Sequence, residues 1–290
     1  MPIEALGLVL LAALLHAVWN IAAKRAGGDF RFTLFVALFV SLVWAPVAVW
    51  LGAPVVGGWG GEVWGLLTLS ALVHLAYFVV LLRGYRAADL TVVYPVARGS
   101  APLITAAFAV LWMGEDLGLV AGAGVGLVCL GVFLIAGGPQ LWRGQQGPAR
   151  VRAGLAWGAA TGLFIAGYSV IDGYGVKVQG VHPVLLDYFG NLLRLPLLLP
   201  AIWPQRAELP ALFRQQWKAA LTVATLGSAG YMLVLEAMTR APLSHVAPAR
   251  EISMLLAALL GGRLLGEQDR GPRLLGAAAM TLGVAALTWA

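Results

Sequence analysis

The hydrophobic residues of this chain form long runs without the alternation that is typical of strands. Each run extends for about 20 residues, enough for one helix to cross a bilayer, whereas barrel strands alternate apolar and polar residues over about 10 residues. In lipid only helices and closed barrels satisfy the backbone. The pattern therefore predicts an all-α integral membrane protein with ten transmembrane helices. The predicted spans cover residues 3–23, 32–51, 63–82, 90–113, 117–136, 154–173, 183–202, 218–238, 243–265 and 272–290.

Composition also indicates lipid as the solvent. Of 290 residues, 60% are hydrophobic and 11% are charged, whereas soluble domains carry about 25% charged residues. The connections are short and rich in glycine and proline, so no soluble domain is expected. The N-terminus becomes apolar after Glu4 with no basic segment before it, which predicts a retained first helix rather than a cleaved signal peptide.

The positive charge is distributed unevenly between the loops. A net charge of +6 does not indicate nucleic-acid binding here, because no basic run of that kind occurs. Lys and Arg concentrate after the odd-numbered spans, and the loops after even-numbered spans contain only Lys177 and Arg240. Positive residues favour cytoplasmic loops, so we predict a multi-pass protein of the cell membrane with both termini outside. The single cysteine, Cys129, supports neither a disulfide framework nor a thiol metal site, and no metal or cofactor is expected.

An internal repeat relates the two halves of the chain. The segment Arg98–Val132 aligns with Arg250–Val284, which pairs Gly114-Glu115 with Gly266-Glu267. We predict two five-helix repeats, residues 1–138 and 154–290, joined by a loop at 139–153. Because five is odd, the second repeat enters the membrane from the opposite side, which gives the inverted repeat of an alternating-access carrier. Weaker matches pair Trp19-Asn20 with Tyr168-Ser169, Ala45-Pro46 with Leu195-Pro196, and Phe78 with Tyr231.

Over its whole length the chain resembles the EamA family of the drug/metabolite transporter superfamily. The resemblance rests on the first-span sequence from Leu14 to Lys24, on Pro95 and Pro248, and on the Gly-Glu pair that ends spans 4 and 9. It implies a ten-helix carrier, and many members export amino acids or related metabolites. Members of the family are often drawn with both termini in the cytoplasm, whereas the loop charges here predict the reverse.

Charged residues within spans are the first candidates for a transport path, because each costs about 3 kcal/mol to insert. In span 7, Asp187, Asn191 and Arg194 share one helical face, with Tyr188 beside them. One interpretation is an Asp-Arg clasp that allows the helix to insert. The other is a stripe that lines a cavity, with Arg194 available to a solute carboxylate.

Spans 4 and 9 combine charges with prolines that are expected to break the helices at Pro95, Pro102 and Pro248. Glu251, next to Arg250, is a candidate for proton coupling, as is Asp187. Alternatively, Arg250 and Glu251 point to different faces and each meets a neighbouring helix. The candidates for the transport path are His16, Trp19, Asn20, His74, Tyr77, Tyr94, Arg98, Tyr168, Asp187, Tyr188, Asn191, Arg194, Tyr231, His245 and Arg250.

Blander explanations remain open for several polar residues. Packing accounts for the aromatic residues as well as a cavity does, and an intramembrane histidine can simply bond a neighbour. Asp172 and Glu236 lie near predicted span ends, where solvation suffices. Spans 5 and 10 are expected to be scaffold, and Glu115 and Glu267 to accept from amides at their starts. In span 5, Gly118, Gly122 and Gly126 form small-xxx-small patterns for close packing.

These observations predict a secondary transporter, with an exporter of amino acids or similar metabolites as the leading hypothesis and proton coupling as its energy source. It would act as a monomer on a small-molecule solute within membrane lipid. The alternatives are an intramembrane enzyme acting on a lipid and a passive channel. The chain is not expected to be an enzyme, because the serine of Gly227–Gly230 is one place early for an acyl-transfer motif and the histidines are scattered.

Overall fold

The computed structural model describes residues 1–26, 29–88, 90–136, 148–256 and 270–290. This part of the chain contains helices and no strand, which confirms the predicted all-α class. The α-helices are α1 (Ile3–Ala26), α2 (Phe30–Val43), α3 (Ala45–Gly52), α4 (Gly61–Ala87), α5 (Leu90–Met113), α6 (Leu119–Ile135), α7 (Pro148–Lys177), α8 (Pro183–Ile202), α9 (Leu209–Thr222), α10 (Ser228–Arg240), α11 (Leu243–Ala249) and α13 (Arg270–Trp289). Short 3₁₀ segments occupy Val56–Gly58 and Trp203–Glu208, and a π-helical segment occupies Val223–Gly227.

Most of the helices fall on the predicted apolar runs, and α5 and α8 have the predicted limits, but α9 begins at Leu209, well before the span predicted to start at residue 218. The predicted loop at 139–153 is too long, because α7 already begins at Pro148. Span 243–265 begins as α11, and its residues 257–265 lie outside the described residues. Within the described residues, five helical segments are long and apolar enough to cross a membrane, or six if α2 and α3, bent by 54°, form one span.

Two irregular segments meet beside the cavity described below. The α2–α3 bend lies at Trp44, with Pro46 in the first turn of α3. In the π-helical segment each turn takes an additional residue, so its carbonyls are displaced from their usual partners. The Trp44 indole Nε1 donates to the Ala224 carbonyl in this segment at 3.2 Å. The bend in the first half of the chain thus supplies a donor to the π-helical segment in the second half.

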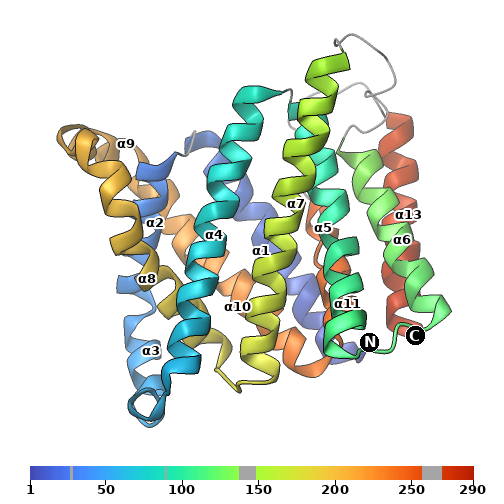
Figure 1. Ribbon diagram of the computed structural model, residues 1–290, viewed down its shortest axis with the longest axis horizontal. Coiled ribbons are helices and arrows are strands. Elements are labelled where there is room, and N and C mark those ends of the chain that lie inside the picture. The colour runs from blue at the N-terminus through green and yellow to red at the C-terminus, as the bar shows by residue number, and fades with distance from the viewer. Residues whose placement is uncertain (27–28, 89, 137–147, 257–269) are drawn as a thin grey trace.

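The two halves of the chain interleave rather than pack as separate blocks (Figure 1). The most extensive helix pairs are α6 with α13, α5 with α7, α4 with α7, α1 with α10 and α2 with α8, and each joins one half to the other. The α6–α13 pair stands at one side of the molecule and α2, α8 and α9 at the other. Both termini lie at the same end.

The seam between α6 and α13 is built on reciprocal glycine contacts. A Cβ atom on Gly124 would lie 2.9 Å from the Gly283 carbonyl oxygen, and one on Gly131 would lie 2.6 Å from the Gly276 carbonyl oxygen. The repeat alignment makes Gly124 equivalent to Gly276 and Gly131 equivalent to Gly283. Each glycine therefore meets the equivalent of the other, which is the contact pattern of a two-fold axis.

The predicted small-xxx-small packing of α6 is wrong in its choice of glycines. A Cβ atom on Gly118 or Gly126 would meet no atom of another helix within 4 Å, and one on Gly122 would reach only Leu117. The register of the seam instead places Gly124 and Gly131 at the contact. Sequence spacing alone does not distinguish between these two faces of the same helix.

Only one of the three predicted proline breaks coincides with a helix end. Helix α5 continues through Pro95 and Pro102, because each proline removes a single backbone donor and the helix satisfies the other groups in lipid. Helix α11 ends at Ala249, directly after Pro248. The chain then tightens into three-residue turns, in which the Glu251 amide donates to the Pro248 carbonyl at 3.0 Å.

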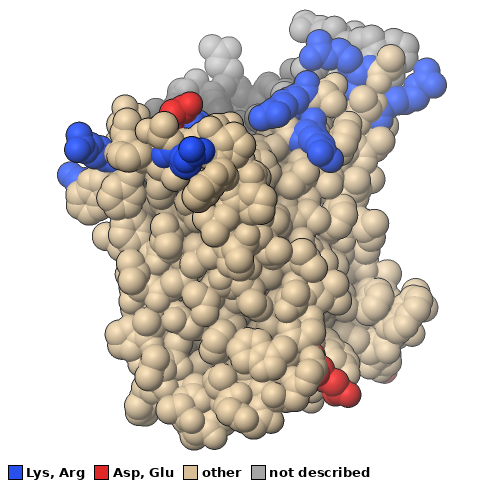
Figure 2. Space-filling view, turned by 60° about the vertical axis from the view of Figure 1, so that its left-hand side comes forward, with Lys and Arg blue, Asp and Glu red and all other residues tan. Residues whose placement is uncertain are grey.

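The two ends of the molecule differ in charge. On the face seen in Figure 2, the Lys and Arg side chains gather at the end opposite the termini. At the terminal end, Lys177 pairs with Glu115, and Arg240 pairs with Glu4 and Glu236. The described basic residues at the other end include Arg83, Arg86, Arg150, Arg152 and Arg206, and we call this end the basic end.

Candidate functional site

A cavity of about 420 Å³ lies between the two halves of the chain. Its walls come from α1, α2, α4 and α5 of the first half, and from α7, α8, the π-helical segment and α10 of the second. Along α1, α4 and α5 the lining residues lie toward the basic end. Of the predicted residues, the lining contains His16, Trp19, Asn20, His74, Tyr77, Tyr94, Arg98, Tyr168, Asp187, Asn191, Arg194 and Tyr231.

The other predicted residues lie behind the walls. Tyr188, one position past Asp187 on α8, faces away from the stripe and packs against Phe189. His245 is buried in α11 beside Ser244. Arg250 does not line the cavity, but its guanidinium carbon lies 5.8 Å from the ring centroid of Tyr168, which does. Glu251 and the three prolines are likewise absent from the lining.

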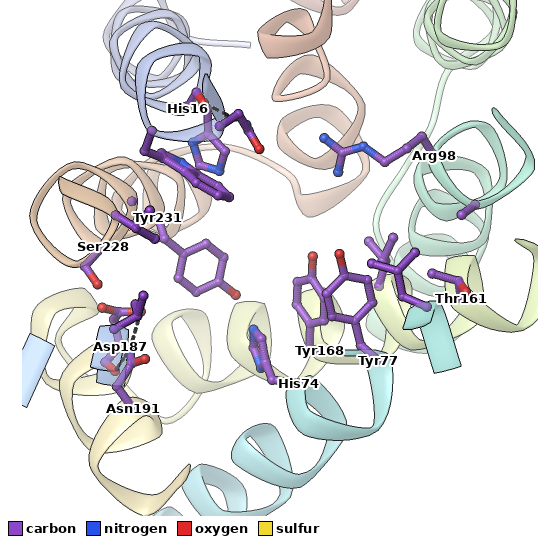
Figure 3. Close-up of a pocket in the computed structure, with 18 of the residues that line it drawn as sticks. His16, His74, Tyr77, Arg98, Thr161, Tyr168, Asp187, Asn191, Ser228 and Tyr231 are labelled. Atoms are coloured by element: carbon purple, nitrogen blue, oxygen red, sulfur yellow. Dashed lines mark hydrogen bonds between the residues drawn. The ribbon is translucent and has the colours of Figure 1, made fainter. Parts of the chain in front are cut away.

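The polar stripe of α8 forms a relay through an amide. Asn191 Nδ2 donates to the Asp187 carbonyl at 2.9 Å and to its Oδ1 at 3.2 Å, and Arg194 Nη1 donates to Asn191 Oδ1 at 3.3 Å. Asn191 thus stands between the acid and the base, in place of the direct clasp. Asp187 Oδ2 and Arg194 Nε are buried without a hydrogen-bond partner. Figure 3 shows Ser228 facing Asp187, on the side of the cavity opposite Arg98.

Two arginines that are equivalent in the repeat share one carboxylate. Arg98 Nε lies 3.4 Å from Glu251 Oε2, and Arg250 Nε lies 3.5 Å from Glu251 Oε1. Arg250 Nη2 also donates to Ser169 Oγ at 3.0 Å. Glu251 thus meets Arg98 of α5 and Arg250 meets Ser169 of α7, as in the alternative in which each meets a neighbouring helix, while the turns after α11 also bring the two side chains within 3.5 Å of each other. The first repeat has Gly99 at the position of Glu251.

A second buried carboxylate, Asp172, connects three helices. It is completely buried, and Ser70 Oγ of α4 donates to its Oδ1 at 2.5 Å while the Tyr231 hydroxyl of α10 donates to its Oδ2. His74 Nε2 lies 3.7 Å from Oδ2, and the His74 ring stacks on Tyr168 at 4.1 Å. The expectation that Asp172 is solvated is wrong, since α7 extends past the predicted end to Lys177.

Comparison with known proteins identifies the family. The model of the EamA-like transporter family matches residues 4–137 and again residues 152–289. The chain belongs to the EamA-like transporter family. This EamA-like protein is accordingly a multi-pass membrane transporter of the drug/metabolite type. No curated protein matches it.

A solved structure supports the fold of this EamA-like transporter. It is described only as a crystal structure of a protein and is 18% identical, with a TM-score of 0.75. The match covers 100% of this chain and 98% of the other. At that identity the likeness concerns the fold alone.

Several lining residues of this EamA-like transporter escape sequence reasoning because they are ordinary side chains on apolar helices. Thr161 and Ile165 precede Tyr168 on the cavity face of α7, and Tyr85 follows Tyr77 on α4. Helical spacing from the two tyrosines was the available signal. The remaining lining residues are Val36, Leu81, Ala97, Val223, Gly227 and Ser228. Among the described residues, no group of three or more His, Cys, Asp or Glu side chains is placed to hold a metal ion.

At the terminal end of this EamA-like transporter, Glu115 holds parts of both halves. It accepts from the Leu243 and Ser244 amides at 2.7 and 2.8 Å and from Lys177 Nζ at 2.9 Å. Partial burial raises the pKa of Glu115, but the hydrogen bonds from Ser244, Lys177 and Leu243 outweigh it and leave the pKa below its ordinary value. Glu115 therefore caps α11 rather than the start of α6 as expected. Glu267 lies outside the described residues.

Proposed function

We propose that this EamA-like protein is a secondary transporter that exports small metabolites bearing both a carboxylate and an ammonium group, such as amino acids. Ten helices would span the membrane as two inverted repeats and move the solute by alternating access. The observation that carries the proposal is the cavity between the halves, in which Asp187 and Arg98 lie on opposite sides of a tyrosine-lined hollow (Figure 3).

Single atoms of the charged side chains lack hydrogen bonds, and this favours a solute with two charged ends. Asp187 Oδ2 and Arg194 Nε are buried without hydrogen-bond partners, and Arg98 Nε, which forms no hydrogen bond, lies 3.4 Å from Glu251 Oε2. Leaving a buried polar group unsatisfied costs about 1–3 kcal/mol, and more when it is charged. A zwitterion would supply a donor to Asp187 and an acceptor to an arginine. The volume of about 420 Å³ lies within the range of about 300–1,000 Å³ that is common for small-molecule sites.

Charge and cavity position support the direction of transport. Positive residues favour the cytoplasmic side of a membrane, so we assign the basic end to the cytoplasm and both termini to the outside. The lining along α1, α4 and α5 lies toward that end, whereas α11, which is entirely buried, packs at the terminal end. This conformation would load solute from the cytoplasm. The reciprocal glycine contacts of α6 and α13 supply an axis about which the repeats can exchange conformations.

Exchange in proteoliposomes tests the proposal. Purified protein is reconstituted with a mixture of the twenty amino acids inside, and uptake of each labelled amino acid is measured by counterflow. We expect exchange of at least one amino acid, lost in Asp187→Asn and retained in Asp116→Asn, which makes the same change at an exposed site. Absence of exchange for all twenty contradicts the substrate class, and normal exchange in Asp187→Asn contradicts the site.

Labelling of introduced cysteines tests the orientation. In a Cys129→Ser background, Glu62→Cys places a thiol at the terminal end and Arg152→Cys places one at the basic end, both at exposed positions. In intact cells a membrane-impermeant maleimide should label only the first, and after lysis it should label both. The reverse pattern contradicts the assigned direction.

A further inference from the structure

The Asp172 cluster lies directly behind the cavity wall. His74 and Tyr231 line the cavity, whereas Asp172 and Ser70 do not. The carboxylate is completely buried and the His74 side chain is 14% exposed. One layer of groups with exchangeable protons, an imidazole and a phenol, therefore separates the buried carboxylate from the solute space.

The hydrogen bonds of the cluster leave room for one proton. His74 Nδ1 lies 3.0 Å from the Ser70 carbonyl, which can only accept, so Nδ1 carries the ring hydrogen. In the neutral ring Nε2 then has a lone pair, and it faces Asp172 Oδ2 at 3.7 Å. Ser70 and Tyr231 already donate to the carboxylate. A proton between Nε2 and Oδ2 would give Nε2 a hydrogen-bonded partner and Oδ2 a second one beside Tyr231.

We propose that His74 and Asp172 form the proton-binding site that couples this transporter to a pH gradient. The assignment rests on the proposed function as a carrier. A proton enters from the cavity, binds at His74 Nε2 and is shared with Asp172 Oδ2, which neutralises the buried carboxylate. When the cavity faces the other side of the membrane, the same proton leaves by the same ring. No other reactant takes part, and each cycle carries one proton across.

The position of the site gives it a means of coupling. Ser70 and His74 belong to the first repeat, whereas Asp172 and Tyr231 belong to the second. Protonation therefore changes hydrogen bonds across the contact that must rearrange when the repeats exchange conformations. The rings of His74, Tyr168 and Tyr231 also line the solute cavity. A solute ammonium group and the proton therefore compete for stabilisation by the same nearby negative charge.

The surrounding charges connect this site to the solute-binding groups. The charges of Arg194 and Asp187 on α8 act on the Asp172 carboxylate. The charges of Arg194 and Arg250 act on the His74 ring. Tyr168, on the same helix as Asp172, contacts both His74 and Tyr231. A solute that pairs with Arg194 or Asp187 changes the field at the proton site, and this is the physical basis for linked binding.

The other buried carboxylates are less suited to carry the proton. Protonating Glu251 would leave Arg98 and Arg250 facing each other without their counter-ion. Asp187 belongs to the cavity wall and its Oδ2 is buried without a hydrogen-bond partner, and the proposed function assigns this carboxylate to the solute. Asp172 is held by neutral hydroxyl groups, so its charge can be cancelled without leaving a cation unpaired.

Proteoliposomes under an imposed pH gradient test the proposal, with the twenty amino acids as the probe and pyranine inside to report pH. We expect the gradient to drive solute accumulation and the solute to move protons in wild type. Asp172→Asn should lose both effects but retain counterflow at equal pH. Asp116→Asn, the matched control at an exposed site, should retain everything. Gradient-driven accumulation that persists in Asp172→Asn overturns the proposal.

A second variant covers the case in which Asp172→Asn does not fold. Ser70→Ala removes a donor to Oδ1, and Ser70 does not itself line the cavity, although its Oγ also lies 3.4 Å from His74 Nδ1. Because that donor stabilises the ionised carboxylate, the pH midpoint of gradient-driven accumulation should move to higher pH. An unchanged midpoint in a folded Ser70→Ala protein overturns the proposal.

Infrared difference spectra between pH values separate this proposal from the proposed function, because they need no solute. A carboxylic carbonyl band that titrates in wild type and disappears in Asp172→Asn supports the proton site. If that band is present but no amino acid is exchanged, the proton site stands and the carrier proposal falls. If amino acids are exchanged but neither the band nor a gradient effect depends on Asp172, the carrier stands and this proposal is wrong.

Discussion

The α6–α13 seam and the central cavity both lie between the two repeats, but the repeat symmetry is kept in the seam and largely lost around the cavity. In the seam, equivalent glycines meet reciprocally. Around the cavity the charges belong mainly to one repeat: by the alignment, Glu251 stands where the first repeat has Gly99, Asp172 where it has Ala23, and Asp187 where it has Ala37. The repeat symmetry thus persists in the glycine seam, and around the cavity it is kept by Arg98 and Arg250 but lost at the three carboxylates.

Removing a cavity charge should affect transport far more than stability. Arg98→Met takes away a guanidinium that lines the cavity, while Glu251 keeps Arg250 as its partner. A hydrogen bond to a charged group contributes about 1.5–3 kcal/mol, so counterflow should fall about 10- to 100-fold. The unfolding temperature in detergent should change little. Arg152→Met, an exposed control at the basic end, should leave both measurements unchanged.

Filling the seam should have the reverse effect. In Gly131→Val the new Cβ would lie 2.6 Å from the Gly276 carbonyl oxygen and 2.8 Å from the Met280 amide nitrogen. Overpacking of this kind costs about 1–3 kcal/mol, and a lower unfolding temperature should reveal it. Gly126→Val, on an open face of the same helix, is the control. Equal stability of the two variants would mean that the seam is not a tight contact.

The Glu115 cap should give a smaller effect that depends on pH. Loss of a helix cap costs about 1 kcal/mol, so Glu115→Gln should lower the unfolding temperature slightly. Because the folded pKa lies below its ordinary value of 4.5, the contribution is complete above about that pH and is lost as pH falls through the folded pKa. Wild type and variant should therefore converge in acid. A constant difference down to low pH would contradict the role of the charge.

The smallest effect is expected at the exposed ion pair of the terminal end. Glu4 and Arg240 contact at 3.1 Å, with 72% and 46% of their side chains exposed. Water and salt screen such pairs, and many contribute nothing measurable. Glu4→Gln should leave both the unfolding temperature and counterflow unchanged. A clear loss of either would assign this pair a role in closing the terminal end.

Sequence reasoning succeeded where a single helix determines the answer. The limits of α5 and α8 follow from apolar runs that end at turn residues, and the α8 stripe follows from helical spacing. It failed where partners are remote in sequence. The apolar run that ends at residue 173 predicts a solvated Asp172 near a span end. Its partners Ser70 and Tyr231 are 102 and 59 residues away in the sequence, so the run does not reveal them. The prediction of the packing glycines in α6 is wrong for a similar reason, because the rotation of a helix about its axis depends on its partner helix.

The π-helical segment Val223–Gly227 also sets the rotation of α10 about its own axis. Each residue of an α-helix turns the chain by about 100°, so the additional residue in this segment sets the angular phase of everything that follows. Ser228 and Tyr231 come directly after it, and the Trp44 indole holds the carbonyl of Ala224 within it. Deleting one residue there would let α9 run into α10 as a plain helix and rotate Tyr231 away from Asp172. The spacing of a single residue thus determines which face α10 offers to the cavity.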